Sequence, residues 1–240
     1  MESSINTAVV LAGGLGSRLK ELVNDRPKPM ADINGKPFLE YLLNYWEKQG
    51  INKFILSVGY LHHKIVDYFG SRFRSAVIEY VVENNQLGTG GALLNCYKEK
   101  SLSEPFLLLN GDTYFPINLN SLNDMFLRKQ ADWCFSLFKT FEINRYLLID
   151  IDHDCRINLE NSKKQLKTKE YWANGGVYIV NPAVLSKFKY LKSKVSLEDY
   201  IISKSFRFGD KFFGFKSDNS FIDIGLPRDY KRILNKKFIL

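Results

Sequence analysis

The sequence lacks any long apolar run. Although hydrophobic residues make up 45% of the 240 residues, no stretch of about 18 apolar residues is present that could span a bilayer. The first residues, Met-Glu-Ser-Ser, also lack the basic and apolar regions of a signal peptide. We therefore expect a cytoplasmic protein without a membrane partner, long enough to bury one large core.

Cysteine and histidine are scarce, with three of each. Cys96, Cys134 and Cys155 are odd in number and show no CxxC spacing, which favours three reduced thiols over a disulfide framework or a zinc site. Two of the histidines are adjacent, so that on a helix they would point in different directions. These residues therefore predict no transition-metal cluster.

Acidic residues are outnumbered, since 34 Lys and Arg against 26 Asp and Glu give a net charge of +8. An excess of this kind suits either nucleic acid or a small polyanion. The densest basic run comprises Lys163, Lys164, Lys167 and Lys169, and it has neither interleaved aromatic residues nor a recognisable nucleic-acid module around it. We interpret it as a solvated loop and expect no nucleic-acid partner.

Short apolar runs alternate with segments of helical periodicity through the first half of the chain. The runs at 7–12, 53–58 and 76–82 predict strands, and the segments 37–48 and 61–69 predict helices. Strands and helices in this order are typical of a largely parallel α/β sheet.

The second half is richer in strands. A buried strand at 106–109 ends at Asn110-Gly-Asp112, a helix is predicted at 119–130, and further strands are predicted at 133–139, 147–151, 176–180 and 211–215. No Pro-, Gly- or Ser-rich linker and no internal repeat divides the sequence. We therefore expect one domain over residues 1–240, with a central mixed, mostly parallel sheet flanked by helices.

A glycine-rich segment, Leu11-Ala-Gly-Gly-Leu-Gly-Ser-Arg-Leu19, follows the first predicted strand. It fits neither the dinucleotide fingerprint, which would need a glycine at Leu19, nor the P-loop, whose Gly-Lys-Ser/Thr ending is absent. The amides of Gly13, Gly14 and Gly16 can still cradle phosphates, and Arg18 offers a fork of donors for phosphate oxygens. The alternative is a tight turn with a surface arginine.

A second basic segment, Arg26-Pro-Lys-Pro-Met30, follows shortly. Prolines on both sides of Lys28 restrict the backbone and predict that this lysine is held in a stiff, non-helical stretch. A lysine presented so rigidly suits a phosphate.

Together with Gly35-Lys-Pro-Phe-Leu39, these two segments resemble the sugar-phosphate nucleotidyltransferase family. The resemblance extends over nearly the whole chain, through Leu87-Gly-Thr-Gly-Gly-Ala-Leu93, Asn110-Gly-Asp112, Asn174-Gly-Gly-Val-Tyr178 and Phe221-Ile-Asp-Ile-Gly-Leu-Pro227. Within the family, the chain most resembles guanylyltransferases that act on D-glycero-α-D-manno-heptose 1-phosphate.

The resemblance implies a single-domain Rossmann-like nucleotidyltransferase fold, with residues 1–112 mainly binding the nucleotide and 113–240 mainly the sugar phosphate. It implies that a sugar 1-phosphate attacks the α-phosphorus of a nucleoside triphosphate, giving pyrophosphate and a nucleotide-activated sugar for surface polysaccharide such as capsule or lipopolysaccharide. The matching catalytic positions are Arg18, Lys28, Asp112 and Asp223. The matching nucleotide-binding positions are Leu11, Ala12, Gly13, Gly14, Gly16, Ser17, Arg18, Lys28, Glu83, Gly88, Thr89, Gly111 and Asp112.

Asp112 and Asp223 each lie in or directly after a short apolar run, and so at a predicted strand end or edge. Two carboxylates together with phosphate oxygens suit Mg²⁺. In the family, the matching aspartates hold the ion that bridges the nucleotide and the sugar phosphate. Mg²⁺ is therefore the implied cofactor.

Glu83 closes the predicted strand 76–82, just before the segment 88–91, for which we predict a second glycine-rich loop. One carboxylate can accept hydrogen bonds from both N1–H and the exocyclic amine of guanine, which favours GTP. A ribose contact and a capped strand end are the alternatives. Gly88 and Gly90 would let the backbone approach the base plane.

Four residues match family positions that contact the sugar: Tyr146, Glu160, Asn174 and Gly175. Asn174 also fits a simple turn residue. The chain departs from the family where Arg145-Tyr-Leu replaces Arg-Tyr-Gly and where Glu160-Asn-Ser replaces Glu-Lys-Pro. The second departure removes a lysine that would neutralise the sugar phosphate. Lys163, Lys139 and Arg145 are the candidates to replace it.

Other functions compete with this interpretation. Within the family, the alternatives are a mannose 1-phosphate guanylyltransferase and a uridylyl-, thymidylyl- or cytidylyltransferase on another sugar phosphate. A silent nucleotide-sensing module is disfavoured because the four matching catalytic positions are retained, and a dehydrogenase because the third glycine is missing. Family members are often dimers or tetramers, so the resemblance implies a homodimer.

Overall fold

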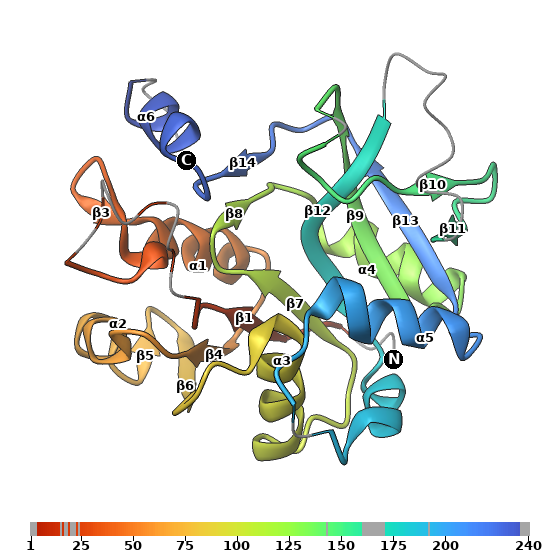
Figure 1. The fold of residues 1–240 in the computed structure, drawn as a ribbon, viewed down its shortest axis with the longest axis horizontal. Coiled ribbons are helices and arrows are strands. Elements are labelled where there is room, and N and C mark those ends of the chain that lie inside the picture. Colours follow the sequence, from red (N-terminus) through yellow and green to blue (C-terminus); the bar gives the residue numbers. More distant parts are fainter. Residues whose placement is uncertain are drawn as a thin grey trace.

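The computed structural model describes residues 4–14, 16, 19, 23, 25–142, 144–159, 171–191 and 193–235. Within these residues, a central sheet of eight strands has the order β13-β9-β12-β7-β1-β4-β6-β5, and helices cover it (Figure 1). Its strands are β1 (Thr7–Leu11), β4 (Lys53–Val58), β5 (Arg72–Phe73), β6 (Ala76–Val82), β7 (Phe106–Asn110), β9 (Trp133–Thr140), β12 (Tyr171–Val180) and β13 (Phe212–Ser217).

Short two-stranded ribbons and helices complete the described part of the chain. The ribbons are β2 (Asp32–Ile33) with β3 (Lys36–Pro37), β8 (Thr113–Tyr114) with β14 (Ile222–Asp223), and β10 (Asp150–Ile151) with β11 (Ile157–Asn158). The helices are η2 (Lys28–Met30), α1 (Phe38–Lys48), α2 (His62–Phe69), α3 (Gly88–Glu99), α4 (Leu119–Arg128), η3 (Pro182–Phe188), η4 (Leu197–Ile202), α5 (Ser203–Arg207) and α6 (Pro227–Asn235). Of these, η2 and η3 are 3-10 helices and η4 is a π-helix.

The direction of the strands determines which loops meet. Strands β7, β1, β4 and β6 are parallel neighbours, whereas β12 is antiparallel to both β7 and β9. Parallel strands end at the same edge of a sheet, and here Leu11 at the end of β1 pairs with Asn110 at the end of β7. The glycine-rich segment after β1 therefore lies beside Asp112.

Alternate residues of β1 pack into different cores. Ala8 and Val10 belong to a cluster that includes residues of α1, α2 and α4, whereas Val9 belongs to a cluster with residues of α3, η3 and η4. All three side chains are fully buried. Because both faces of the sheet are covered, its central strands are continuous apolar runs.

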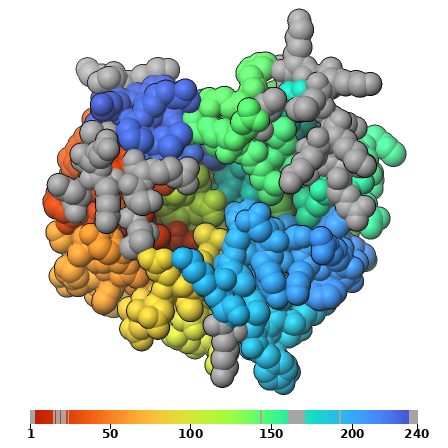
Figure 2. Space-filling view, in the orientation of Figure 1, coloured from red at the N-terminus to blue at the C-terminus, as the bar shows by residue number. Residues whose placement is uncertain are grey.

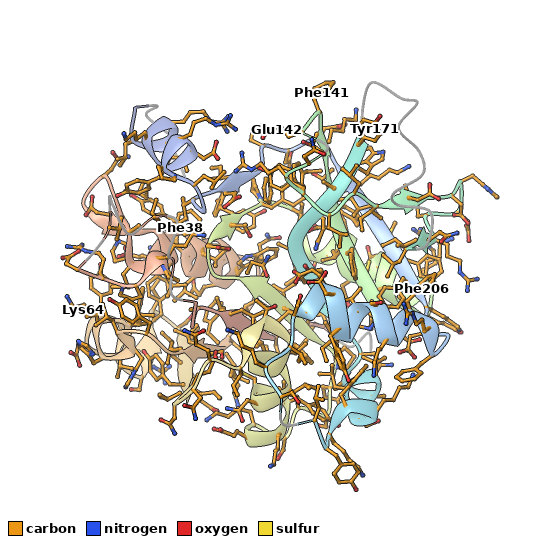
Figure 3. All side chains as sticks on the ribbon, in the orientation of Figure 1. Phe38, Lys64, Phe141, Glu142, Tyr171 and Phe206 are labelled. Carbon is orange, nitrogen blue, oxygen red and sulfur yellow. The ribbon has the colours of Figure 1, made fainter. Side chains whose placement is uncertain are left out.

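The predicted mixed, mostly parallel α/β sheet is confirmed, and α1, α2 and α4 lie within two residues of the predicted helices. The strand predicted at 176–180 begins earlier, at Tyr171. Its register shifts between Asn174 and Tyr178, where Gly176 has a φ of +70°. This bulge interrupts the alternation of the sequence and conceals the first half of the strand. Tyr171 lies at the same end of the β9–β12 pair as Phe141 and Glu142, which follow β9 (Figure 3).

The strand predicted at 147–151 is wrong over most of its length, since only Asp150–Ile151 form β10. β7 ends opposite Val177, which leaves one side of the outer half of β12 open. Residues 147–149 approach that side with an isolated bridge from Leu148 to Ala173 and two backbone hydrogen bonds of 2.9 and 3.0 Å. This pairing involves too few residues to form a strand of the sheet.

The glycine-rich loop predicted at 88–91 is also wrong, because these residues form the first turn of α3. Glycine has a poor intrinsic helix propensity, so the sequence favours a loop. Packing overrides it, since Gly90 N donates to Val195 O at 3.0 Å. A Cβ at Gly90 would lie 2.7 Å from Ser196 O, so this turn needs glycine in order to approach the segment before η4.

Among the described residues, no helix is both long enough and apolar enough to cross a membrane.

Candidate active site

A cavity of about 380 Å³ opens at the carboxyl ends of the central strands, the edge where α/β sheets bind ligands. Figure 2 shows the hollow near the middle of the molecule, between the segments around residues 90 and 195. The described residues that line it are Leu11, Ala12, Gly13, Gly14, Gly16, Lys28, Pro29, Glu83, Gln86, Gly88, Thr89, Ala92, Asn110, Asp112, Lys194, Glu198 and Gly225. Most of the predicted nucleotide positions therefore surround one cavity.

The glycine-rich segment after β1 forms one wall. A Cβ at Gly13 would collide with the carboxylate of Glu83, and a Cβ at Gly16, whose φ is +59°, would lie 2.9 Å from Lys28 Cβ. Glycine is therefore required at both positions for the loop to lie against Glu83 and Lys28. Of the predicted contacts in this segment, Ser17 and Arg18 lie outside the described residues.

Lys28 and Asp112 meet in the cavity, with Lys28 Nζ 2.5 Å from Asp112 Oδ2. Lys28 is the first residue of η2, so the prediction of a non-helical stretch is wrong. Pro27 before it is extended, with ψ of 150°, while Pro29 and Met30 are buried. The buried turn holds the lysine at the base of the cavity, where its side chain is only 13% exposed.

Asp223 lies next to Asp112 although 110 residues separate them in the sequence. β14 pairs with β8 so that Asp223 is opposite Thr113, and Ile224 N donates to Asp112 O at 3.0 Å. A Cβ at Gly225 would lie 2.6 Å from Asp223 Oδ1 and 2.9 Å from Lys28 Nζ. The ribbon therefore brings together both predicted metal carboxylates and Lys28, three of the four predicted catalytic residues.

Two carboxylates are a suitable but incomplete set of metal ligands. In the described part of the chain, no group of three or more His, Cys, Asp or Glu is placed to hold an ion. Mg²⁺ commonly binds through one or two carboxylates and completes its shell with water and substrate phosphates. The donors present are hard oxygen ligands, and one of them, Asp112, lines the cavity, so they fit that pattern.

Arg145 forms ion pairs with carboxylates of the protein itself. Its guanidinium bonds Asp223 Oδ2 at 3.0 Å and Asp229 Oδ2 at 2.5 Å, and it lies over the ring of Tyr146. Burial lowers the pKa of Arg145, but the hydrogen bonds that it donates to Asp229 and Asp223 raise it by more, so it stays charged. We therefore do not assign the sugar phosphate to Arg145.

Lys139, a second candidate for the sugar phosphate, is not among the described residues that line the cavity. Lys139 pairs with Asp218 at 3.0 Å and lies over the ring of Trp172, and Lys163 is outside the described residues. The structure places a different lysine there, Lys194, which donates to Gln86 Oε1 at 2.9 Å across the cavity rim.

Glu83 faces the cavity from the end of β6. Ser57 Oγ donates to its Oε1 at 3.0 Å and Leu87 N approaches Oε2 at 3.4 Å. Burial raises the pKa of this carboxyl above its usual range. Neighbouring Gly88 lines the cavity, but a Cβ there would collide with Val195 O, so packing already explains this glycine. Thr89 also has an internal structural contact, because its Oγ1 accepts a hydrogen bond from Leu197 N at 2.8 Å.

The predicted sugar residues are held by internal contacts. Asn174 donates to Tyr178 OH at 2.6 Å and accepts from Gly176 N at 3.1 Å, as a bulge residue does. A Cβ at Gly175 would lie 2.6 Å from Ser136 Oγ. Tyr146 packs edge-on against Phe138 and Phe221. None of the three lines the cavity described above, and Glu160 is outside the described residues.

Gly111 supports the cavity from below. Its N donates to Leu11 O at 3.0 Å, and a Cβ there would lie 2.7 Å from the same oxygen. This glycine therefore permits the close approach of the chain after β7 to the end of β1.

Sequence reasoning missed several residues that line the cavity, above all Glu198, but also Asn110, Gln86, Lys194 and Gly225. Glu198 lies on the π-helix η4, and Ser196 Oγ donates to its Oε2 at 3.3 Å. Burial raises the pKa of Glu198, and the charges of Asp199 and Asp112 add to the effect. The sequence around it, Ser-Leu-Glu-Asp-Tyr, has the form of an ordinary helix start and carries no signal of this position.

The fold and this cavity define a nucleotidyl transferase, and the chain belongs to that family: the Nucleotidyl transferase model matches residues 7–237. The chain is 41% identical, over 94% of its length and 95% of its relative, to D-glycero-alpha-D-manno-heptose 1-phosphate guanylyltransferase of Aneurinibacillus thermoaerophilus. It is 36% identical to the protein of the same name from Campylobacter jejuni, covering 95% of this chain and 98% of that one.

A solved structure also supports the assignment to this family. HddC from Yersinia pseudotuberculosis, crystallised in complex with GMP-PN, superimposes with a TM-score of 0.80 at 34% identity, covering 96% of this chain and 98% of that chain. The resemblance inferred from the motifs, both to the family and to heptose 1-phosphate guanylyltransferases, is confirmed.

Proposed function

We propose that this protein transfers GMP from GTP to D-glycero-α-D-manno-heptose 1-phosphate, releasing pyrophosphate and forming a GDP-activated heptose. The observation that carries the proposal is the contact of Lys28 with Asp112 in a cavity lined by the glycine-rich segment and Glu83, with Asp223 on the ribbon strand that pairs next to Asp112. The names of two relatives that match over nearly their full length support the choice of base and sugar.

The reaction is an in-line displacement without a covalent enzyme intermediate. A phosphate oxygen of the sugar 1-phosphate forms a bond to the α-phosphorus of GTP, and the bond from that phosphorus to the oxygen bridging the α- and β-phosphates breaks. Pyrophosphate leaves with those electrons. Catalysis of this kind depends on positioning and charge neutralisation.

Each part of the cavity has a role in this scheme. Lys28 neutralises charge that builds on the α-phosphate, and the amides of Gly13, Gly14 and Gly16 contact the triphosphate. From the family resemblance alone, we assign Arg18 and Ser17 to the triphosphate as well. Glu83 accepts from N1–H and the exocyclic amine of guanine.

Asp112 and Asp223 would hold Mg²⁺, which supplies charge neutralisation at the phosphates when bound. Lys28 already lies against Asp112 Oδ2, and Arg145 against Asp223 Oδ2.

Location, assembly and use of the product belong to the same proposal. We assign the protein to the cytoplasm, where nucleotide triphosphates are available, as a possible homodimer whose product feeds surface polysaccharide synthesis. Tyr146, Glu160, Asn174 and Gly175 remain our candidates for the acceptor site. A mannose 1-phosphate guanylyltransferase is the second candidate function, because a mannose acceptor has the same ring configuration.

Pyrophosphate release by the purified protein tests the proposal. With Mg²⁺ present, five nucleoside triphosphates are crossed with a panel of hexose and heptose 1-phosphates. We expect release with GTP and the manno-configured heptose phosphate. Release with another base refutes the role of Glu83, and release with another sugar refutes the heptose assignment. Nucleotide binding without any turnover would instead indicate a regulatory module.

A further inference from the structure

Ser57 is a polar residue at a fully buried position of the central sheet. It lies near the end of β4, where it pairs with Leu11 of β1 on one side and with Val81 of β6 on the other, and its exposed fraction is 0%. Its neighbours in β4, Leu56 and Val58, are apolar and equally buried. A hydroxyl in such surroundings is costly unless it has a hydrogen-bond partner. A serine at this position therefore needs an acceptor close by.

The acceptor is the carboxylate of Glu83. Ser57 Oγ donates to Glu83 Oε1 at 3.0 Å, and Leu87 N approaches Oε2 at 3.4 Å. The hydroxyl also interacts with the thiol of Cys96 on α3, whose pKa is raised by burial to about 12. A thiol that stays neutral is only a weak acceptor, so the proton of the hydroxyl goes to the carboxylate. Neither Ser57 nor Leu87 is among the described residues that line the cavity, so Glu83 is held from behind.

These contacts decide how many acceptor sites Glu83 can offer to a ligand. An ionised carboxylate has about four lone-pair sites, shared equally between its oxygens. A donor of the protein takes one site on each oxygen, so each oxygen keeps one site for the cavity, which Glu83 lines. Guanine presents two adjacent donors, N1–H and the exocyclic amine, which match this remaining pair. Adenine instead presents an acceptor at N1, which an ionised carboxylate repels.

We infer that Ser57 is a positioning residue for base recognition: by fixing Oε1 of Glu83, its hydroxyl aligns the carboxylate with both donors of guanine. The inference rests on the proposed function. The contact with Leu87 N is the longer of the two, so the hydroxyl provides the stronger restraint. Its hydrogen bond also favours the ionised carboxylate, because it lowers the pKa that burial raises. Ser57 thus acts through Glu83 and does not need to touch the nucleotide.

The test measures the dissociation constants of GTP, ITP and ATP with Mg²⁺ by titration calorimetry, so that no acceptor sugar is needed. ITP keeps the N1–H of guanine but lacks the exocyclic amine. We expect Ser57→Ala to weaken GTP binding about 10-fold at neutral pH. ITP binding should weaken by less, so the preference for GTP over ITP falls. At saturating substrates, kcat with the heptose phosphate should change by less than about twofold, because the residues at the phosphates are unaltered.

Two further measurements separate positioning from a purely structural role. In a Glu83→Gln background, Ser57→Ala should change GTP affinity by less than about twofold, because Ser57 acts through the carboxylate. In the wild-type background, Ser57→Ala should raise the pH at which GTP affinity falls, since a hydrogen bond that favours the ionised carboxylate is lost.

Ser205→Ala is the matched control. Ser205 lies on α5, is also fully buried and donates to a carboxylate, that of Asp210, but it is not among the described residues that line the cavity. This variant should lose stability while its GTP affinity stays within about twofold of the wild type. Thermal unfolding shows that each variant is folded. If Ser57→Ala does not fold, Ser57→Cys, which nearly keeps the size of the side chain but is a weaker donor, should weaken GTP binding by a smaller factor.

Three results would overturn the inference. The first is unchanged GTP affinity and selectivity in folded Ser57→Ala. The second is an equal loss of affinity when Ser57→Ala is added to Glu83→Gln, and the third is a loss of similar size in Ser205→Ala. Wild-type GTP affinity in Glu83→Gln refutes the guanine contact of the proposed function, whereas a weakened Glu83→Gln with an indifferent Ser57→Ala refutes only this inference.

Discussion

Single side chains determine the charge of the cavity floor. Lys28 and Asp112 are in direct contact at 2.5 Å, and the Asp112 side chain is still 37% exposed to the cavity. A carboxylate in this position can hold the lysine in place and face a metal-bound phosphate at the same time. Its negative charge, rather than its shape, is what the proposed reaction uses.

Replacement of Asp112 by Asn tests that use of charge. We expect Asp112→Asn to lower kcat at least about 100-fold, which corresponds to about 3 kcal/mol of transition-state stabilisation. Pyrophosphate release is measured at saturating substrates. Asp124→Asn, an exposed change on α4, is the control and should retain full activity. Turnover of wild-type size in Asp112→Asn would remove Asp112 from the mechanism.

Glu83 offers a test by pH. Burial raises the pKa of Glu83 above its usual value of 4.5, and guanine binding needs the ionised form. GTP affinity should therefore fall as the pH drops through this raised pKa. In Glu83→Gln, the GTP KM should be higher at neutral pH and should lose this part of the pH dependence. Measuring the GTP KM of both proteins from about pH 5 to about pH 8 checks the prediction.

The same shift has a consequence for stability. Because the folded pKa lies above the unfolded one, the folded protein binds the proton more tightly. The stability linked to protonation is therefore present at low pH and lost as the pH rises through the folded pKa. Glu83→Gln should be at least as stable as the wild type at neutral pH. A marked loss of stability there would show that Glu83 has a structural role and would weaken its assignment to the base.

At the scale of elements, the site depends on ion pairs that join separate segments. Arg145 connects the loop after β9 to β14 through Asp223 and to α6 through Asp229, and Asp229 is almost fully buried. Removal of the arginine would leave Asp223 without this cation and Asp229 with only the longer contact to Arg228, at 3.7 Å. A buried pair of this kind is costly to break from one side.

Arg145→Met should therefore lower the free energy of unfolding by about 3 kcal/mol, as measured by denaturant titration. The matched control is Arg228→Met. Arg228 contacts Glu142 and Asp229, and Arg145 contacts the same two carboxylates, with Glu142 at 3.3 Å. The Arg228 side chain is 70% exposed, so the loss should be only about 0.5 kcal/mol. Equal losses in the two variants would contradict the role given to Arg145.

The first turn of α3 also joins two separate segments, by close packing against η4 rather than by an ion pair. A Cβ at Gly90 would lie 2.7 Å from Ser196 O and 2.8 Å from Ile201 Cγ1, so η4 must shift to accept it. We expect Gly90→Ala to destabilise the protein by about 2 kcal/mol in thermal or denaturant unfolding. At Gly14 nothing lies within 4 Å of the corresponding Cβ, and Gly14→Ala should leave stability unchanged. If Gly90→Ala left the free energy of unfolding unchanged, this contact would not be tight in solution.

At the scale of the whole molecule, the cavity is built from both halves of the chain, including Gly13 and Gly14 from the first and Lys194 and Glu198 from the second. A ligand that fills it contacts the folded protein but not the unfolded chain. GTP at 100 times its dissociation constant should stabilise the protein by about 2.7 kcal/mol, which raises Tm by about 7 °C for a chain of this size. ATP at the same concentration should give a clearly smaller shift. Equal shifts would refute the guanine preference.

The local pattern of the sequence was enough to predict the α/β class and most elements. Its buried runs separated by amphipathic segments have the periods of covered strands and surface helices, and α1, α2 and α4 follow from them. Where glycine or a bulge interrupted the pattern, prediction failed. The first turn of α3 and the outer half of β12 form because neighbouring segments supply the hydrogen bonds and the packing.

The sequence by itself also pointed to the residues that we propose for the reaction, since the glycine-rich segment, Lys28, Asp112 and Asp223 lie in motifs that carry the family resemblance. It could not show that Arg145 pairs with Asp223 and Asp229, that Lys194 donates to Gln86, or that Glu198 lines the same cavity as Asp112. These residues lie far apart in the chain and occur in unremarkable local patterns. Only the tertiary structure brings them together, because the order of strands in the sheet decides which loops meet at its carboxyl edge.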